Sequence, residues 1–340
     1  MRFKTFAGFV GPSLFLMFLI IAVPLGAVFW QSFHLTRNVL EQVETEVCTP
    51  GFVAPICRTE LQLQSQIDEF GKVVTLTKFV GFQNYRNVIE PDKLWASLVD
   101  RDWNALMNVR FWKALRFTLM FTLLTLPIVL ITGLAIALAV NNTVNSVKGP
   151  VIFISLLPFI ITPVIGALAV RWLFIGDGIL TALLEWYLER DIAMFAQAST
   201  IELMMYMYRV WHVAPFAFVV FYAGLQMGSR ETLESAMLDG ANRWQRLRYI
   251  TIPHLKPLII FVALIHLMDA YRVFEEIVGF SSQAYVISLQ YLTYDYLIPD
   301  EAFTRAIGRA SASAMLTMIG IVLLLIYPLR RIWLDRRTFK

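Results

Sequence analysis

The sequence predicts an all-α membrane protein with six transmembrane helices, an extracytoplasmic insertion after the first helix and a helical cytoplasmic loop between the fourth and fifth. Three observations predict this fold class. Of the 340 residues, 58% are hydrophobic and only 16% are charged, whereas soluble domains average about 25% charged residues. The mean hydropathy is +0.62. Long runs without a charged residue recur along the chain, and each can cross about 30 Å of hydrocarbon as a helix.

The predicted spans follow one another along the whole chain, 1–340, which we expect to form a single transmembrane domain. The charge-free runs are residues 5–36, 117–147, 149–170, 210–229 and 310–329. A further span begins at Pro257 and meets charged residues after Met268, so its outer half is expected to face a polar environment. The first run is longer than the apolar core of a signal peptide and lacks a small-residue cleavage site, which favours an uncleaved anchor.

Positive charges are distributed unevenly between the segments that join these spans. If the N-terminus is cytoplasmic, the inner segments are 1–8, 141–149, 227–256 and 330–340, with 13 Lys and Arg against 4 Asp and Glu. The rest of the chain carries 16 basic and 21 acidic residues. Because Lys and Arg concentrate in cytoplasmic loops, we expect both termini in the cytoplasm and residues 37–112 outside it. The net charge of +4 is dispersed and does not favour nucleic-acid binding.

The two cysteines, Cys48 and Cys57, lie in the predicted insertion. The residues between them include Pro50, Gly51 and Pro55, so a turn could bring the thiols within bridging distance. A disulfide is favoured if this side of the membrane is oxidising. The alternative is two free thiols, and in either case the role would be structural.

The motifs of several enzyme classes are missing from the sequence. There is no phosphate-binding G-x-x-x-x-G-K-[ST] loop, no H-E-x-x-H and no G-x-S-x-G. The four histidines (His34, His212, His254 and His266) are scattered. We therefore expect no metal site, no catalytic residue and no ATP hydrolysis by this chain itself.

The loop at 227–256 predicts two short helices joined by a turn. Apolar residues recur at four-residue intervals in its first part: Leu233, Met237 and Ala241. Gly240 permits a sharp turn. A second amphipathic helix is expected from Trp244, stopped by Pro253 and Pro257.

Two interpretations of this loop remain open from physical reasoning alone. It could be an interfacial helix resting on anionic lipid, which would explain its four arginines. It could instead bind a protein partner. The partner interpretation better explains the acidic Glu234 and Asp239 and the small residues around them.

The loop resembles a motif of a known family. Glu234-Ser-Ala, Asp239-Gly240-Ala241 and Ile252-Pro253 are similar to the "EAA" loop of binding-protein-dependent ABC importer permeases. Further segments resemble the maltose-type sugar permeases in the same order, among them Phe79–Tyr85, Leu157-Pro158 and Ala223–Gln226. The sequence departs from the pattern at Ser235, where the family has alanine, at Ile252, where leucine often precedes the proline, and at 279–282, where a Gly-Gly-Pro turn is common.

The resemblance implies a set of partners and a coupling role for the loop. It implies a second homologous permease subunit, two ATPase subunits that bind ATP and Mg, a periplasmic solute-binding protein and a sugar, glycoside or polyol, with no cofactor on this chain. It implies location in the bacterial inner membrane, in contact with its lipid. The residues expected to couple the loop to an ATPase subunit are Glu234, Ala236, Asp239, Gly240, Ala241 and Trp244.

Charged residues gather near the outer end of the fifth span. On a continuous helix Asp269, Arg272 and Glu276 fall within about 60° of one another, and Arg272 and Glu276 have the i, i+4 spacing at which a salt bridge forms easily. Asp269 lies about 18 Å beyond Pro257 along the helix. Charges at that depth face a bundle interior or a water-filled cavity.

Several roles for this polar face remain open. It could hold helices together through a salt bridge, or line a sugar pathway in which carboxylates and guanidinium groups bind hydroxyls. Aromatic residues expected near that pathway are Tyr271, Trp211, Tyr222 and Tyr208. Alternatively, Asp269 and Glu276 could serve an ion- or proton-coupled secondary transporter or a membrane-embedded enzyme.

Overall fold

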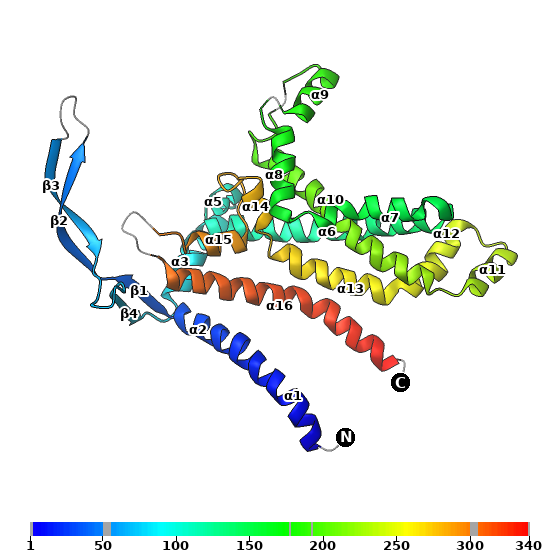
Figure 1. Ribbon diagram of the computed structural model, residues 1–340, viewed down its shortest axis with the longest axis horizontal. Helices are drawn as coiled ribbons and strands as arrows, with labels where there is room; N and C mark the ends of the chain where they lie inside the picture. Colours follow the sequence, from blue (N-terminus) through cyan, green and yellow to red (C-terminus); the bar gives the residue numbers. More distant parts are fainter. Residues whose placement is uncertain (1–2, 50–55, 177, 192, 300–304, 339–340) are drawn as a thin grey trace. The chain divides into compact units, whose positions relative to one another are not determined.

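The computed structural model describes residues 3–49, 56–176, 178–191, 193–299 and 305–338 (Figure 1). The chain divides into two compact units, one of residues 1–112 with 292–319 and the other of 113–291 with 320–340. The helices in order are α1 (Phe3–Met17), α2 (Val23–Ser32), α3 (Gln83–Ile89), α4 (Pro91–Val99), α5 (Trp103–Met107), α6 (Arg110–Asn141), α7 (Asn145–Ile160), α8 (Pro163–Phe174), α9 (Ile179–Leu188), α10 (Ala198–Gln226), α11 (Arg230–Leu238), α12 (Arg243–Arg246), α13 (Ile252–Tyr271), α14 (Glu275–Gly279), α15 (Leu289–Asp295) and α16 (Ile307–Thr338). Two π-helical segments are η1 (Phe18–Ala22) and η2 (Leu247–Thr251).

Membrane-crossing candidates follow the predicted order. Among the described residues, five helical stretches are long and apolar enough to span a membrane: Gly8–Ser32, Arg110–Asn141, Ala198–Gln226, Arg243–Tyr271 and Ile307–Arg330. A sixth is formed if the bent pair Ser146–Ile160 and Pro163–Phe174 counts as one span. The protein is therefore a mostly helical membrane protein, as the hydropathy predicts.

The third predicted span is not a straight helix. Its two halves, α7 and α8, are bent by 94° at Ile161 and Thr162. Proline disfavours helical geometry in the residue before it and cannot donate a backbone hydrogen bond. Thr162 accordingly has extended geometry before Pro163, with φ −63° and ψ 140°. The charge-free run 149–170 was predicted as one span because hydropathy does not detect a break in the helix at Thr162.

The fifth predicted span is continuous where a stop was expected. Helix runs from Arg243 through η2 and α13 to Tyr271, past Pro253 and Pro257. Pro253 is the second residue after the π-helical turn η2, in which the hydrogen bonds run i to i+5 rather than i to i+4. This wider turn accommodates Pro253, which has no backbone N–H to donate. The prediction that these prolines end a short helix was wrong.

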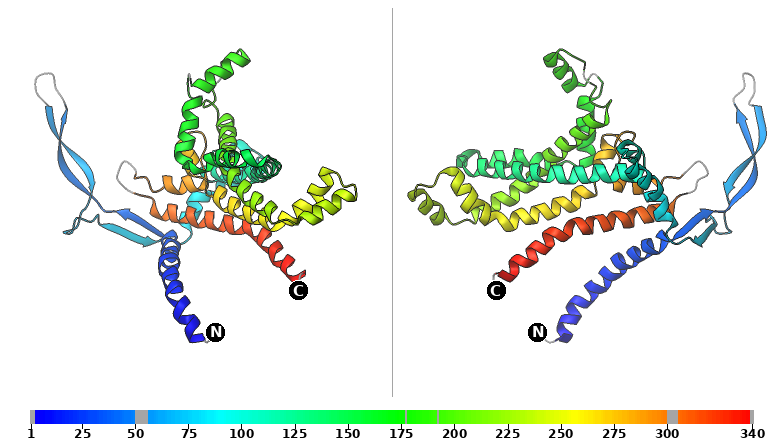
Figure 2. Two further views of the ribbon diagram at one scale, coloured as in Figure 1. Left: turned by 45° about the vertical axis from the view of Figure 1, so that its right-hand side comes forward. Right: turned by 180° about the vertical axis from the view of Figure 1, so that it is seen from behind.

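The predicted insertion contains strands, so the all-α prediction was wrong for this segment. β1 (His34–Asn38) pairs with β4 (Thr75–Phe79), and β2 (Leu40–Thr49) pairs with β3 (Ile56–Ser65), both antiparallel. Figure 2 shows β2 and β3 as a long twisted hairpin. Apolar and polar residues alternate only over Leu61–Gln64 of β3, as strands do, and a search for membrane spans does not detect so short a pattern.

The strand register bears on the predicted disulfide. Cys48 of β2 stands directly opposite Cys57 of β3 along the backbone. Opposite residues of an antiparallel pair have Cβ atoms about 4.5–5.5 Å apart. The side chains of both cysteines lie outside the described residues, so the disulfide stays a prediction.

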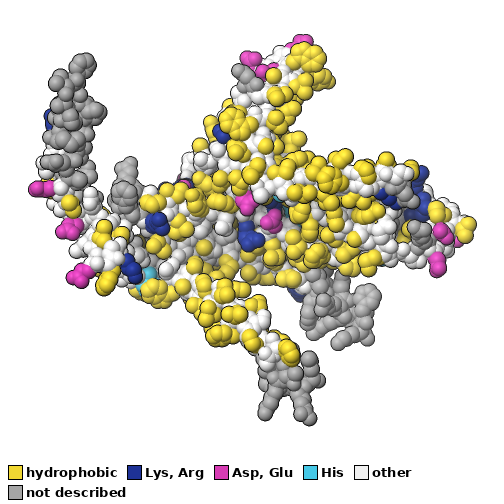
Figure 3. Space-filling model, in the orientation of Figure 1, with side chains coloured by type: hydrophobic (Ala, Val, Ile, Leu, Met, Phe, Trp, Pro, Cys, Tyr) yellow, Lys and Arg dark blue, Asp and Glu magenta, His cyan; other side chains and the backbone are white. Residues whose placement is uncertain are grey.

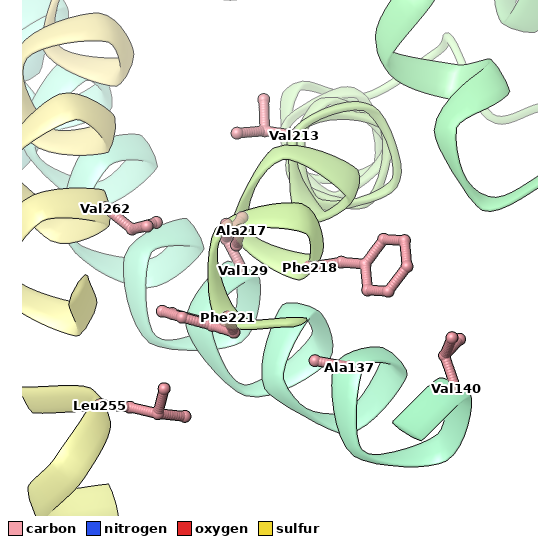
Figure 4. Close-up of a cluster of buried hydrophobic side chains, with 9 residues drawn as sticks. All are labelled: Val129, Ala137, Val140, Val213, Ala217, Phe218, Phe221, Leu255 and Val262. Atoms are coloured by element: carbon pink, nitrogen blue, oxygen red, sulfur yellow. The ribbon is translucent and has the colours of Figure 1, made fainter. Parts of the chain in front are cut away.

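The unit of residues 113–291 and 320–340 is built around a cluster of buried apolar side chains (Figure 4). The cluster joins α6, α10 and α13: Val129, Ala137, Val140, Val213, Ala217, Phe218, Phe221, Leu255 and Val262. Gly133 allows α6 to approach α10, because a Cβ atom there would lie 3.0 Å from the Phe218 backbone nitrogen. Small residues at such crossings are typical of helix packing in membranes. The packing holds α10 beside α13, which positions the site described next.

Candidate functional site

The loop between α10 and α13 forms an exposed helix–turn–helix. Ser229 accepts a hydrogen bond from the Thr232 backbone at 3.4 Å and caps α11. Gly240 takes the left-handed conformation, with φ +80°. Asn242 and Gln245 form a reciprocal capping box at the start of α12. The sequence therefore predicted the turn correctly.

Side chains at the tip of this loop project into solvent. Leu238 is 90% exposed and Trp244 is 65% exposed, although both are large and apolar. The residues predicted to couple the loop to a partner divide as follows: Glu234 and Ala236 lie on α11, Asp239, Gly240 and Ala241 form the turn, and Trp244 lies on α12. Of these, Ala236 and Ala241 are half-buried and the others are exposed. An exposed apolar tip with acidic neighbours is suited to a protein partner.

A buried arginine joins three helices of the same unit. Arg209 of α10 donates through Nη1 to Glu276 Oε1 of α14 at 2.7 Å, and its Nη2 donates to Asp269 Oδ2 of α13. The side chains of Arg209 and Glu276 are only 5% and 2% exposed, whereas that of Asp269 is 56% exposed. We call these three residues the Arg209 cluster. Its buried charges are compensated within the cluster, as the apolar surroundings require.

The Arg209 cluster lines a cavity of about 840 Å³. The walls come from the bend between α7 and α8, from the middle of α10 and from the region where α13 ends and α14 begins. Figure 3 shows charged side chains gathered near the middle of an otherwise largely hydrophobic face. A cavity of this size is in the range of small-molecule sites. The 94° bend of the third span thus supplies one wall, at Phe159–Pro163.

Two histidines in the cavity wall hold their neighbours in place. His212 Nε2 lies 2.9 Å from the Ile161 carbonyl oxygen at the α7–α8 bend. His266 Nε2 lies 2.9 Å from Thr125 Oγ1 of α6. The Nδ1 atoms of both rings are buried without a hydrogen-bond partner among the described residues. The site therefore combines aromatic walls with polar groups whose hydrogen-bonding capacity is not all used.

The predicted polar residues do lie at one cavity, but in a different arrangement. Asp269, Arg272 and Glu276 all line it. The helix, however, ends at Tyr271, and Glu276 belongs to the separate helix α14. The Arg272 side chain donates from Nε to the Met268 carbonyl oxygen at 3.3 Å, and Glu276 binds Arg209 instead. The Arg272–Glu276 salt bridge that the i, i+4 spacing allows does not form, because that spacing assumed an unbroken helix.

The aromatic residues predicted near the pathway are not among those that line the cavity. Tyr271 is buried with its hydroxyl against Gly320. Tyr222 packs against the apolar cluster of Figure 4, and Trp211 is 47% exposed. Tyr208 donates its hydroxyl to the Pro163 carbonyl oxygen at 2.8 Å. The aromatic rings that line the cavity, apart from the histidines, are Phe159, Phe216 and Phe274.

Sequence reasoning missed the central residue of the site. Arg209 bounded a charge-free run and was treated as the end of a span, whereas α10 continues eleven residues before it, from Ala198. Glu202 on the same helix was missed for the same reason, and it binds Arg116 of α6. The available signal was an arginine and a glutamate within one otherwise apolar stretch, a pattern that indicates pairing or function inside a membrane.

Comparison with known proteins is consistent with this architecture. No family model matches the chain. The chain is 28% identical over 319 residues to the trehalose transport system permease protein SugA of Mycobacterium tuberculosis, a match covering 92% of this chain and 84% of that protein. It is 24% identical over 248 residues to the trehalose/maltose transport system permease protein MalF of Thermococcus litoralis, covering 72% and 76%.

A solved structure shares the fold. A chain of a bacterial ABC transporter involved in import of the acidic polysaccharide alginate aligns with a TM-score of 0.61 and 21% identity, covering 77% of this chain and 85% of that chain. The helix order, the exposed loop before the fifth span and the sequence matches over most of the chain agree with one another. The chain is thus similar over most of its length to permease proteins of trehalose and maltose transport systems, and it shares its fold with a chain of an ABC transporter.

Proposed function

We propose that this chain is one permease subunit of a binding-protein-dependent ABC importer for a sugar, glycoside or polyol in the bacterial inner membrane. It forms half of the translocation pathway, with a second homologous permease subunit forming the other half. Two ATPase subunits bind ATP and Mg, and a periplasmic protein delivers the solute. The chain itself forms part of the transport pathway and has neither a catalytic site nor a cofactor.

The proposed topology has six membrane-crossing segments, with the bent pair α7–α8 as the third. The strands and short helices within 37–112 lie outside, whereas the loop 227–256 and both termini lie in the cytoplasm. The uneven distribution of Lys and Arg between the two sides supports this orientation.

The Arg209 cluster and its cavity carry the proposal. A guanidinium between two carboxylates offers directed donors and acceptors, the chemistry that binds hydroxyl groups. Asp269, Arg272 and Glu275 are exposed charged residues of the cavity wall. Asp269 and Arg272 would contact the solute, while Glu276 is buried and would hold Arg209 in place. The saccharides in the names of the relatives support a carbohydrate.

The helix that leaves the exposed loop gives a mechanical route to this cavity. α12, η2 and α13 form one helical stretch, Arg243–Tyr271. Trp244 near its start and Asp269 near its end are about 38 Å apart along the axis. A partner that moves the loop would therefore rock the wall of the cavity, because packed helices move as rigid bodies.

A substitution in the loop tests the coupling role. Glu234→Lys reverses an exposed charge on α11, so we expect loss of ATP-driven uptake in proteoliposomes while the permease pair still assembles. Glu69→Lys, an exposed acidic residue in the insertion, is the matched control and should transport normally. Normal transport by Glu234→Lys with ATPase subunits bound would contradict the coupling assignment.

A second pair of variants tests the pathway role. Asp269→Ala and Arg272→Ala should weaken uptake without preventing assembly of the complex. Loss of assembly would instead support a purely structural salt bridge. Uptake by the permease in vesicles that lack ATPase subunits, driven by a proton gradient, would favour a secondary transporter that uses Asp269 and Glu276. The binding of both carboxylates to Arg209 argues against that role.

A further inference from the structure

A second cavity lies in the unit formed by residues 1–112 and 292–319, and the transport function does not use it. Its volume is about 300 Å³. The polar residues that line it and carry the argument are Arg37, Arg110, Arg305, Arg309, Asp295 and Tyr296. We call it the arginine cavity.

Positive charge in the arginine cavity exceeds negative charge. Asp295 is the one acidic residue among the described residues that line it, and its Oδ2 already binds Arg110 Nη2 at 2.6 Å. The guanidinium groups of Arg110 and Arg309 both approach the Tyr296 ring, at 6.0 Å and 5.6 Å from its centroid. Four arginines that converge on one hollow repel one another. An anion that entered the hollow would be attracted by all four.

The arginine cavity lies where three membrane-crossing helices end. Arg37 follows shortly after Ser32, the last residue of α2, and Arg110 is the first residue of α6. Arg309 lies in the first turn of α16. Helix ends of spanning segments mark the boundary between hydrocarbon and water. Trp30, two residues before the end of α2, is 55% exposed, and tryptophan is typical of membrane interfaces.

We propose that the arginine cavity binds the phosphodiester headgroup of an anionic phospholipid. Arginine matches phosphate because its planar fork donates two parallel hydrogen bonds. Ile298, an apolar residue of the cavity wall that is 46% exposed, would contact the lipid glycerol and acyl chains. This inference rests on the proposed function only for the choice of leaflet, because the proposed orientation of the chain puts the cavity at the outer leaflet. Lys and Arg usually concentrate on the cytoplasmic side of a membrane protein, so four arginines at the outer leaflet depart from that distribution.

The test measures phosphatidylglycerol bound to the complete transporter, purified with its partner chains, by native mass spectrometry. The double variant Arg305→Gln/Arg309→Gln should bind this lipid about 25-fold more weakly than wild type, since one arginine near a lipid surface contributes about 1 kcal/mol, or about 5-fold. Phosphatidylcholine binding should not change. The control Arg86→Gln removes an exposed arginine of α3 that binds Asp92 outside the cavity, and should bind phosphatidylglycerol like wild type.

Three results would overturn the proposal. Equal binding of phosphatidylglycerol by wild type and double variant would show that the arginines do not hold the headgroup. Displacement of the lipid by an equimolar amount of inorganic phosphate would show a site for a free anion. Weaker binding of the solute-binding protein, with lipid binding unchanged, would show a protein contact. If the double variant fails to assemble, Arg37→Gln on the exposed face of β1 tests the same site, with a weakening of about 5-fold expected.

Discussion

Removal of the Arg209 guanidinium is the sharpest test of how the site is held together. Arg209→Met keeps most of the side-chain volume and removes the charge. Glu276, whose side chain is 2% exposed, then has no cation to bind, whereas Asp269, at 56% exposed, can be hydrated. The structure therefore predicts that the loss of stability comes almost entirely from the buried carboxylate.

The magnitudes rank three variants. Breaking a buried pair by removing one partner costs about 3–5 kcal/mol, the value expected for Arg209→Met. Glu276→Gln keeps an acceptor for Arg209 and leaves the ion pair with Asp269, so a loss of about 1–2 kcal/mol is expected. Asp269→Asn breaks a largely exposed pair and should cost about 0–1 kcal/mol.

The double variant Arg209→Met/Glu276→Gln distinguishes this explanation from simple loss of packing. With both charges gone, no buried ion is left unpaired, so about 2–3 kcal/mol of the loss should be recovered relative to Arg209→Met. The measurement is the thermal unfolding midpoint of each purified complex, followed by size-exclusion chromatography. A double variant less stable than Arg209→Met, or an Asp269→Asn variant as unstable as Arg209→Met, would refute the reasoning.

Three further predictions concern other parts of the chain. Gly240→Ala forces a side chain into a left-handed conformation that costs about 1–2 kcal/mol, so ATP hydrolysis by the assembled transporter should respond less to solute; an unchanged response would mean that the turn geometry is dispensable. Gly320→Ala places a Cβ atom against the Tyr271 hydroxyl and should lower stability by about 1–3 kcal/mol, a loss that Tyr271→Phe in the same chain should partly restore in thermal unfolding. Cys48 and Cys57 face each other in register, so both thiols should resist alkylation until reductant is added; rapid labelling without reductant would show that they are free.

The polar site illustrates how far spacing along a chain can be trusted. Asp269, Arg272 and Glu276 were identified because ionised groups are rare within membrane spans, and all three do line one cavity. Their mutual geometry was predicted from an ideal helix. The chain leaves helical geometry at Arg272, with φ −96° and ψ 25°, and this break turns Glu276 toward Arg209.

The sequence by itself determined the membrane character, the order of the spans and the turn at Gly240, because hydropathy and backbone preference act over short stretches. Only the tertiary structure decided which buried charges pair. Arg209 and Glu276 are 67 residues apart in the chain, and their meeting depends on how α10 and α14 pack. The bend at Thr162 likewise became part of a cavity wall only once α8 packed against α14. Partner choice among buried charges is set by three-dimensional proximity in a medium where an unpaired ion is costly, and no local pattern encodes that proximity.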